Sequence, residues 1–301
     1  MKIATSAYPL SWFNSFADYE AKLTKWVEEA AGQGAQLLVF PEYGAMELAS
    51  LGGASVAADQ EASLHEAARH RPAADDLHVR LAKQYGAHIL GGSGPVFDKS
   101  IHPDRPVNRA TLYGPGGIVG HQDKSMMTRF EREDWNVVAG NDLTVFRTPL
   151  GLIGVSICYD SEFPLLARSL AEAGVELLLV PSATEALAGF TRVRIGAMAR
   201  ALECQLVSVH SPVVGAAAWC AGMEENTGRA SIYGPPDRGF PAEAIIAEGR
   251  LGEPGWIYAD ISLEAVREVR RDGGVLNLNH WLEQVGPSQK VKFAGIGPEC
   301  A

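Results

Sequence analysis

The 301-residue sequence predicts a layered α/β fold in which sheets pack face to face and helices lie outside. Two observations indicate this fold class. Short, continuous apolar runs typical of buried strands alternate with segments of helical periodicity. Two β-hairpins, each marked by a Gly/Pro-rich turn between β-rich runs, interrupt this alternation in the middle of the chain. No linker or break in composition divides the sequence into two domains.

The N-terminal part begins with a strand–helix–strand unit. A short strand is expected over residues 2–7, and apolar residues recur at helical spacing over 16–30. The run QLLVF at 36–40 is typical of a strand covered on both faces, and a proline ends it. A second helix over 75–85, ended by Gly86, and a buried strand over 87–90 then repeat the pattern.

The two hairpins come next. Residues 109–113 and 118–121 are joined by GPGG, and residues 143–147 and 152–157 are joined by TPLG. Helix and strand alternation then resumes up to a charged helix and a tail rich in Gly and Pro. The expected helices are 164–173, 192–203 and 262–271, and the expected strands are 176–180, 205–210, 230–233, 244–247 and 256–260.

Composition and charge exclude several classes of function. The net charge of −10 would repel a phosphate backbone, so no nucleic acid partner is expected. Neither a secretory signal nor an apolar stretch long enough for a membrane span is present, which predicts a cytoplasmic protein. The four cysteines (158, 204, 220 and 300) form no C-x-x-C pair, and the histidines form no H-E-x-x-H motif. We therefore expect neither a catalytic metal nor a cofactor.

Cys158 is a candidate nucleophile because of its place in the chain. It ends the run GLIGVSI and is followed by YDSEFP, so the chain passes from a buried strand through a tight turn into a helix. Other hydrolases place a nucleophile at such a turn, where the next backbone N–H, here that of Tyr159, can bind an oxyanion. The alternative is that Cys158 is a small core residue.

Glu42 and Lys124 also follow expected strands. Glu42 comes directly after QLLVF and Pro41, where partial desolvation would raise the pKa of a carboxyl group toward that of a useful base. Lys124 follows a hairpin strand, and its ammonium would favour the thiolate of a nearby cysteine and donate to an oxyanion. Taken alone, each residue is equally compatible with a solvated position. Together they predict a catalytic site at the strand ends.

The three segments around these residues resemble the nitrilase superfamily of carbon–nitrogen hydrolases. They are VFPEYG, HQDK and VSICYDSEFP, and they occur in the family's order. The resemblance runs from about residue 1 to residue 271 and includes the stretches TRVRIGAMARALECQ and RASIYGPP. It implies a four-layer αββα sandwich over 1–271 that forms a homodimer or higher homo-oligomer. Residues 272–301 are then a C-terminal tail and a candidate for packing on a partner subunit.

The resemblance also implies catalytic roles for particular residues. Glu42 would be the general base, Lys124 the oxyanion stabiliser and Cys158 the nucleophile. Many members have a further Glu in the loop after the lysine, which leaves Glu131 and Glu133 as candidates here. We prefer Glu133, because its distance to Gly140 matches the family spacing, although an alanine replaces the usual proline before that glycine.

The expected reaction is hydrolysis of a small-molecule amide through a thioester. C-Y-D accompanies amide hydrolysis more often than nitrile hydrolysis in this superfamily, and its dicarboxylate-monoamide hydrolases carry an Arg shortly afterwards. Because this chain has Ser161 and Glu162 there, we expect a neutral or cationic amide. Expected substrate-binding residues are Tyr159, Glu162, Glu131 and Thr184. The alternatives are a nitrile or carbamoyl-amine hydrolase with the same triad, or a non-catalytic binding protein.

Overall fold

The first of two large sheets contains both chain segments that lead to Glu42 and Lys124. The computed structural model describes residues 1–292 and 294. Seven strands form this sheet: β1 (Lys2–Ala7), β2 (Leu37–Val39), β3 (His88–Leu90), β4 (Gly94–Val96), β5 (Val107–Gly114), β6 (Gly117–Asp123) and β15 (Gly255–Asp260). Their order is β15-β1-β2-β3-β5-β4, with β6 paired to β5. Strands β1, β2 and β3 are parallel, so their carboxyl ends lie along one edge.

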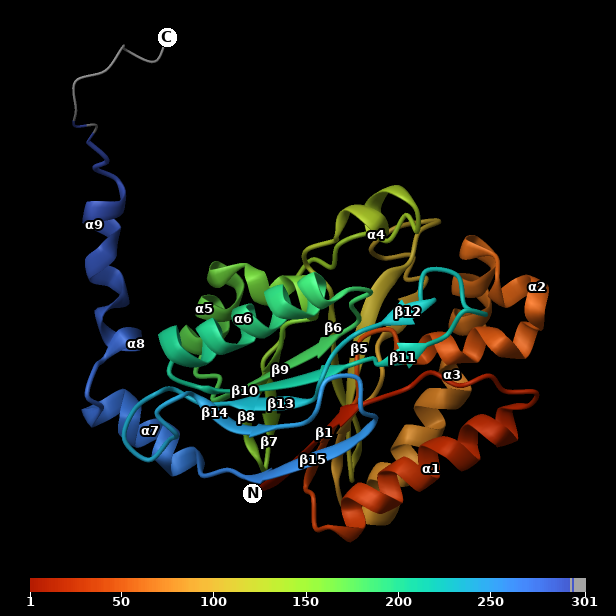
Figure 1. The fold of residues 1–301 in the computed structure, drawn as a ribbon, viewed down its shortest axis with the longest axis horizontal. Coiled ribbons are helices and arrows are strands. Elements are labelled where there is room, and N and C mark those ends of the chain that lie inside the picture. Colours follow the sequence, from red (N-terminus) through yellow and green to blue (C-terminus); the bar gives the residue numbers. More distant parts are fainter. Residues whose placement is uncertain (293, 295–301) are drawn as a thin grey trace.

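The second sheet contains the strand that leads to Cys158. Its six strands are β7 (Phe146–Thr148), β8 (Gly151–Val155), β9 (Leu177–Ser182), β10 (Val207–Pro212), β13 (Ser231–Tyr233) and β14 (Ile245–Glu248). Their order is β14-β13-β10-β9-β8-β7, in which β8, β9 and β10 are parallel. A separate pair, β11 (Gly215–Ala216) and β12 (Glu225–Asn226), lies over one end of the molecule (Figure 1).

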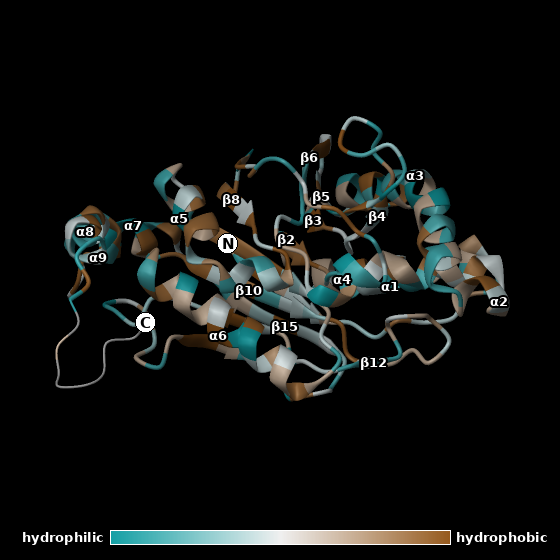
Figure 2. Cartoon of the chain, turned by 90° about the horizontal axis from the view of Figure 1, so that it is seen from above, coloured by the Kyte–Doolittle hydropathy of each residue, from teal (hydrophilic) through white to brown (hydrophobic). Residues whose placement is uncertain are grey.

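The two sheets pack face to face through apolar side chains. Ile3, Leu37 and Val39 of the first sheet belong to the same buried cluster as Ile153 and Leu177 of the second. Leu38, between two of these residues, belongs to a different cluster on the outer face, as expected for the alternation of side chains along a strand. Figure 2 shows hydrophobic colour along the central strands and many hydrophilic residues on the surrounding helices.

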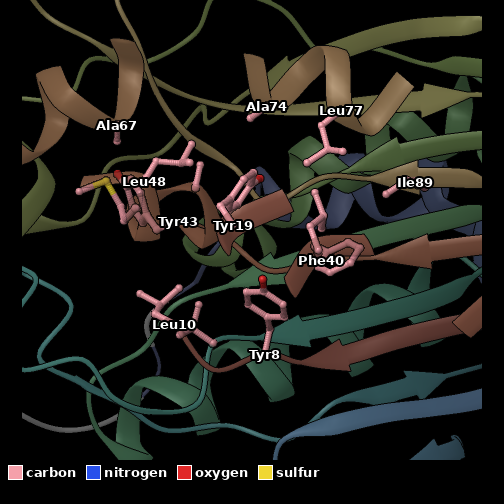
Figure 3. Packing of buried hydrophobic residues seen from close by; sticks show 14 of the residues in the cluster. Tyr8, Leu10, Tyr19, Phe40, Tyr43, Leu48, Ala67, Ala74, Leu77 and Ile89 are labelled. Carbon is pink, nitrogen blue, oxygen red and sulfur yellow. The ribbon is translucent and has the colours of Figure 1, made fainter. Parts of the chain in front are cut away.

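Helices cover both outer faces. The first sheet is covered by α1 (Phe16–Gly32) and α3 (Gln60–Tyr85), and the second by α5 (Pro164–Glu172) and α6 (Leu187–Glu203) (Figure 1). Figure 3 shows the core under α3, where Leu77 and Ala74 of the helix lie over Ile89 and Phe40. This arrangement confirms the expected four-layer αββα sandwich, and both expected hairpins pair antiparallel.

The structure corrects the expected start of the second helix. Instead of beginning at residue 75, α3 begins at Gln60, where the side chain of Asp59 accepts a hydrogen bond from the Ala62 N–H. The helix continues through Pro72, although a proline removes one hydrogen bond of the helix interior. Apolar residues on both sides of Pro72 pack into the same core, and this packing outweighs the local propensity.

Several short elements were not expected from the sequence. They are η1 (Gly44–Gly52), α2 (Ala54–Ala57) and α4 (Arg129–Glu133). The segment after α7 (Leu263–Asp272) was expected to be irregular. It instead contains α8 (Asn277–His280), η3 (Trp281–Gln284) and α9 (Val285–Ser288). Its start packs on the sandwich, because the Arg168 guanidinium lies 4.5 Å from the Trp281 ring centroid. Cys300 lies outside the described residues.

Two further findings concern the described part of the chain. None of its helices is both long enough and apolar enough to cross a membrane. Within residues 1–292 and 294, no group of three His, Cys, Asp or Glu side chains is arranged to hold a metal ion.

Candidate active site

Glu42, Lys124 and Cys158, which are far apart in the sequence, line one cavity of about 430 Å³. Glu42 follows β2, Lys124 follows β6, and Cys158 begins the short helical turn η2 (Cys158–Glu162) after β8. Two of these strands belong to the first sheet and one to the second. The cavity therefore lies where the strand ends of both sheets meet, as the sequence predicts.

Cys158 occupies a strained turn. Its φ of 50° lies in the left-handed region, which few residues other than glycine adopt, and such strain is concentrated at functional sites. The Ser161 hydroxyl donates to the Cys158 carbonyl at 2.7 Å and fixes the turn. Burial and the neighbouring Glu42 carboxylate raise the pKa of the thiol well above its ordinary value, against the opposing effect of Lys124. Lys124 thus favours the thiolate, as expected, but burial and Glu42 outweigh its effect on the pKa of the thiol in the resting site.

The Glu42 carboxylate is buried and held by donors on both oxygens. Oε1 accepts from Lys124 Nζ at 2.7 Å and from Asn108 Nδ2 at 3.0 Å, and Oε2 accepts from the Ala183 N–H at 2.9 Å. Burial raises the pKa of Glu42, although Lys124 opposes this effect. The Cys158 thiol donates to the Ala183 carbonyl at 3.7 Å, on the same residue whose N–H holds Glu42 Oε2. A carboxylate of raised pKa beside a protonated thiol is suited to accept its proton.

Lys124 connects two buried carboxylates. Its ammonium donates to Glu42 Oε1 at 2.7 Å and to Glu131 Oε1 and Oε2 at 2.8 and 2.7 Å. Burial disfavours the ammonium, but Glu131 and Glu42 together outweigh it and raise the pKa of Lys124 well above its ordinary value. The lysine is thus charged at neutral pH and supplies a fixed positive charge beside the thiol.

The structure places Glu131, and not the preferred Glu133, beside Lys124. The Glu131 side chain is 3% exposed, whereas that of Glu133 is 56% exposed and pairs with Arg129. Glu131 is the third residue of α4 and forms a capping box with Thr128, which directs its carboxylate inward. Glu133, two residues later, faces away from the cavity because neighbours at that spacing lie on different sides of a helix. The distance from Glu133 to Gly140 in the sequence did not identify the right glutamate, because the short helix α4 decides which side chain points into the cavity.

Asp160 ties the cysteine turn to the lysine loop. Its buried carboxylate accepts hydrogen bonds from the backbone N–H groups of Met126 at 2.7 Å, of Ser125 at 3.1 Å and of Ile157 at 3.1 Å. Burial raises the pKa of Asp160 to about 7, although Lys124 opposes this effect. These bonds fix the position of Lys124 relative to Cys158.

The expected substrate-binding residues all line the cavity. Tyr159 and Glu162 lie on the cysteine turn, and Thr184 follows β9 with its hydroxyl donating to the Thr227 carbonyl at 2.8 Å. Arg192 of α6 lies opposite Glu162, with 3.4 Å between their nearest side-chain atoms. The cavity lining also includes the acidic side chains of Glu185, Glu224 and Glu225.

Sequence reasoning missed four residues of this site: Tyr43, Asn108, Asp160 and Arg192. Tyr43 donates to Glu131 Oε1 at 2.7 Å. Two of the four were detectable, because Tyr43 directly follows the motif VFPE and Asp160 lies within C-Y-D. Asn108 gives no clear local signal, because its strand also carries the polar residues Arg109 and Thr111. No local signal indicates Arg192, which reaches the cavity through the packing of α6.

Relatives of this chain include a named hydrolase and named amidases. A relative from Bacillus subtilis (strain 168), named a probable hydrolase, is 30% identical over 92% of this chain and 53% of its own length, so the chain spans about half of that protein. The omega-amidase NIT2 of Danio rerio is 28% identical over 85% of this chain and 86% of its own.

Solved structures share the fold. Saccharomyces cerevisiae Nit3, a member of the nitrilase superfamily, has a TM-score of 0.70 at 21% identity and covers 90% of this chain and 93% of its own. The NitN amidase from Nesterenkonia sp. AN1 has a TM-score of 0.70 at 23% identity and covers 96% of this chain and 100% of its own. The family model for carbon-nitrogen hydrolases matches residues 2–271, and the chain therefore belongs to the carbon-nitrogen hydrolase family.

Proposed function

We propose that the protein is an amidase that hydrolyses a small neutral or cationic amide through a thioester on Cys158. One observation carries this proposal: the Cys158 thiol and the Glu42 carboxylate both bond to the backbone of Ala183, Glu42 is also bonded to the Lys124 ammonium, and all three groups line one cavity. A protonated thiol beside a base of raised pKa is suited to attack that is coupled to proton transfer. The cavity volume of about 430 Å³ fits a small molecule.

In the first half-reaction, Glu42 takes the thiol proton as the sulfur attacks the amide carbonyl carbon. The charge that develops on the carbonyl oxygen is stabilised by Lys124 and the Tyr159 N–H. Lys124 makes one bond to Glu42 and two to Glu131, so the substrate oxygen would replace one of the two bonds to Glu131. Glu131 keeps its bonds from Tyr43 and Thr128 and stays in place.

Collapse of the tetrahedral intermediate breaks the C–N bond. The proton held by Glu42 passes to the leaving nitrogen, which departs as ammonia or an amine. A water molecule then gives a proton to Glu42 while its oxygen attacks the thioester. The second intermediate releases a carboxylic acid, and Cys158 recovers its proton.

Similar proteins support the choice of an amide substrate. Several relatives carry the name omega-amidase, and one from Yersinia enterocolitica is named deaminated glutathione amidase. A mutant of the Nesterenkonia amidase carries acrylamide attached by Michael addition at its active-site cysteine. A cysteine nucleophile acting on an amide-sized molecule is thus documented on this fold.

The charges at the cavity mouth support a neutral or cationic substrate. Glu162, Glu185, Glu224 and Glu225 outnumber Arg192, and Arg192 is already opposite Glu162. An anionic substrate tail would meet net repulsion, while an ammonium tail would meet attraction. This charge distribution argues against a dicarboxylate monoamide, the class that the sequence motif also disfavours.

The test is product release from a substrate panel, with Cys158→Ala as the inactive control. The panel contains a neutral aliphatic amide, an ω-amino amide, a dicarboxylate monoamide, a carbamoyl amine and a nitrile. We expect kcat/KM to be highest for one of the first two. Preference for the dicarboxylate monoamide would refute the charge argument, and preference for the nitrile or the carbamoyl amine would refute the reaction class.

We also propose that the protein is a homo-oligomer in the cytoplasm. Four large apolar side chains on or beside the outer helices α5 and α6 are strongly exposed: Leu165, Leu187, Ile195 and Leu202. A second copy packed on this layer would cover them. Light scattering during size-exclusion chromatography gives the oligomer mass, and a monomer at micromolar concentration would contradict the first part.

A further inference from the structure

We propose that Asn108 is a positioning residue for the general base. Its side-chain amide holds the Glu42 carboxylate so that Oε2, and not Oε1, takes the proton of the Cys158 thiol. This inference rests on the proposed role of Glu42 and adds a residue to which neither the sequence motifs nor the comparisons assign a role.

The hydrogen bonds around Glu42 distinguish its two oxygens. Oε1 accepts from Asn108 Nδ2 at 3.0 Å and from Lys124 Nζ at 2.7 Å, which uses both of its lone pairs. Oε2 accepts from the Ala183 N–H at 2.9 Å and keeps one lone pair. Because Asn108 and Lys124 hold Oε1, Oε2 is the oxygen that can take a proton without breaking either bond.

Asn108 also holds the strand that leads to Lys124. Its backbone carbonyl accepts the Lys124 N–H at 2.9 Å, while its side chain donates to Glu42. One residue therefore fixes both the base and the start of the lysine loop. A shift of Asn108 would change the position of Glu42 relative to Lys124.

The surroundings of Asn108 indicate that the fold alone does not explain this amide. Asn108 is fully buried in β5 and shares a face of the strand with Ala110 and Leu112, which lie in the apolar cluster between the sheets. Within residues 1–292 and 294, no group donates a hydrogen bond to its Oδ1. An unpaired buried acceptor is unfavourable, so an apolar residue would suit the core better. The bond to Glu42 is the gain that offsets this penalty.

Removing the amide should have a measurable effect on the proton affinity of Glu42. A hydrogen bond to a carboxylate stabilises the charged form and lowers its pKa. In Asn108→Leu, which has a similar volume, the bond is lost and the pKa of Glu42 rises. In Asn108→Asp, a second carboxylate faces Glu42, and the rise is larger because like charges repel.

The experiment measures two pH profiles for wild type, Asn108→Leu and Asn108→Asp. One is kcat and KM for the best amide, and the other is the rate of Cys158 alkylation by iodoacetamide, which needs no substrate. In Asn108→Leu we expect the acidic limb of both profiles to move up by roughly half a pH unit or more. We also expect kcat to fall about tenfold at the optimum with KM little changed. Glu42→Gln should remove the limb and so assign it.

Gln205→Met is the matched control. Gln205 is also a buried side-chain amide, which donates to the Val269 and Val275 carbonyls and accepts from the Leu278 N–H. It precedes β10, whose other end pairs with Ser182 beside the cavity. This change should lower the melting temperature without moving either limb.

The result that overturns the inference is an Asn108→Leu protein with wild-type limbs, or one whose losses match those of Gln205→Met. If Asn108→Leu does not fold, Asn108→Asp decides alone, because it keeps the size of the side chain and replaces the amide donor with a carboxylate; limbs at their wild-type positions would then overturn the inference. If the wild type hydrolyses no amide, the proposed function fails. The alkylation profiles then still decide the role of Asn108.

Discussion

The buried bottom of the cavity and its exposed mouth hold their charges in different ways. At the bottom of the cavity, the side chains of Glu42, Lys124 and Glu131 are 1–3% exposed and their ion pairs measure 2.7 Å. At the mouth, those of Glu162 and Arg192 are 21% and 60% exposed, and the pair measures 3.4 Å. Removing one partner of an ion pair at the bottom of the cavity leaves a buried charge uncompensated, whereas water replaces a lost partner at the mouth.

This difference separates reaction from selectivity. The buried charges are fixed relative to the thiol, and in the proposed mechanism they stabilise charge that develops during the reaction. The exposed charges act on the substrate tail through a screened field. Substitutions at the bottom of the cavity should therefore reduce turnover of every substrate, and substitutions at the mouth should change the ranking of substrates.

The largest effect is expected for Glu42→Gln. This nearly isosteric change removes the base, so kcat should fall about 10²- to 10⁴-fold while the protein stays folded. Mass spectrometry should detect no acyl-enzyme, and circular dichroism should report an unchanged fold. In wild type, the raised pKa of Glu42 implies that kcat/KM falls as the pH is lowered through a value above the usual range of a glutamate. Near wild-type turnover in the variant would show that the base is another residue.

Two glutamates two residues apart give the next largest contrast. Glu131→Gln should lower kcat about 10- to 100-fold, because Lys124 loses the partner that balances its charge. The same change should lower the free energy of unfolding by about 1–3 kcal/mol. Glu133→Gln is the matched control, and its exposed pair with Arg129 should contribute less than about 0.5 kcal/mol. Equal effects of the two variants on kcat would contradict the conclusion that Glu131, and not Glu133, acts with Lys124.

A smaller contrast is expected among the thiols. Cys158 opens onto the cavity beside a base, whereas Cys204 and Cys220 are fully buried with pKa values that burial raises to about 12. Brief alkylation with less than one equivalent of reagent should therefore label Cys158 first and abolish activity. Peptide mapping by mass spectrometry measures the order. Labelling of Cys204 or Cys220 first, with activity retained, would argue against Cys158 as nucleophile.

The smallest effect is expected at the mouth. Glu162→Gln removes one negative charge and frees Arg192, so kcat/KM for a dicarboxylate monoamide should rise about two- to fivefold relative to a neutral amide. Arg192→Gln should change the ratio in the opposite direction. High salt should reduce both effects, because exposed charges are screened. A fall in kcat for all substrates would instead mean that Glu162 acts in turnover, like the residues at the bottom of the cavity.

Regular local signals made much of the fold predictable. The apolar runs QLLVF at 36–40 and ELLLV at 176–180 gave the buried strands that became β2 and β9, and the turns GPGG and TPLG gave both hairpins. The first turns of α3 were missed, since the expected helix began at residue 75, whereas packing against the sheet lets the helix continue through Pro72. The three short helical elements between residues 44 and 133 lack the length that periodicity needs.

The candidate site divides in the same way. Glu42, Lys124 and Cys158 each lie in a motif within a few residues of a strand end, and so the sequence was sufficient to single them out. Asn108 and Arg192 lie in no such motif. Their relation to the site depends on strand pairing and helix packing between segments that are 66 and 30 residues apart in the sequence.

The sequence by itself determined which strands lead to the candidate cysteine, glutamate and lysine, because apolar runs, turns and polar strand ends are local properties of the chain. The tertiary structure alone decided that Glu131 and not Glu133 meets Lys124, and that burial and Glu42 raise the pKa of the Cys158 thiol. The direction of a side chain depends on the short helix that carries it. A pKa depends on burial and on charges contributed by distant segments, which become neighbours only when both sheets have packed.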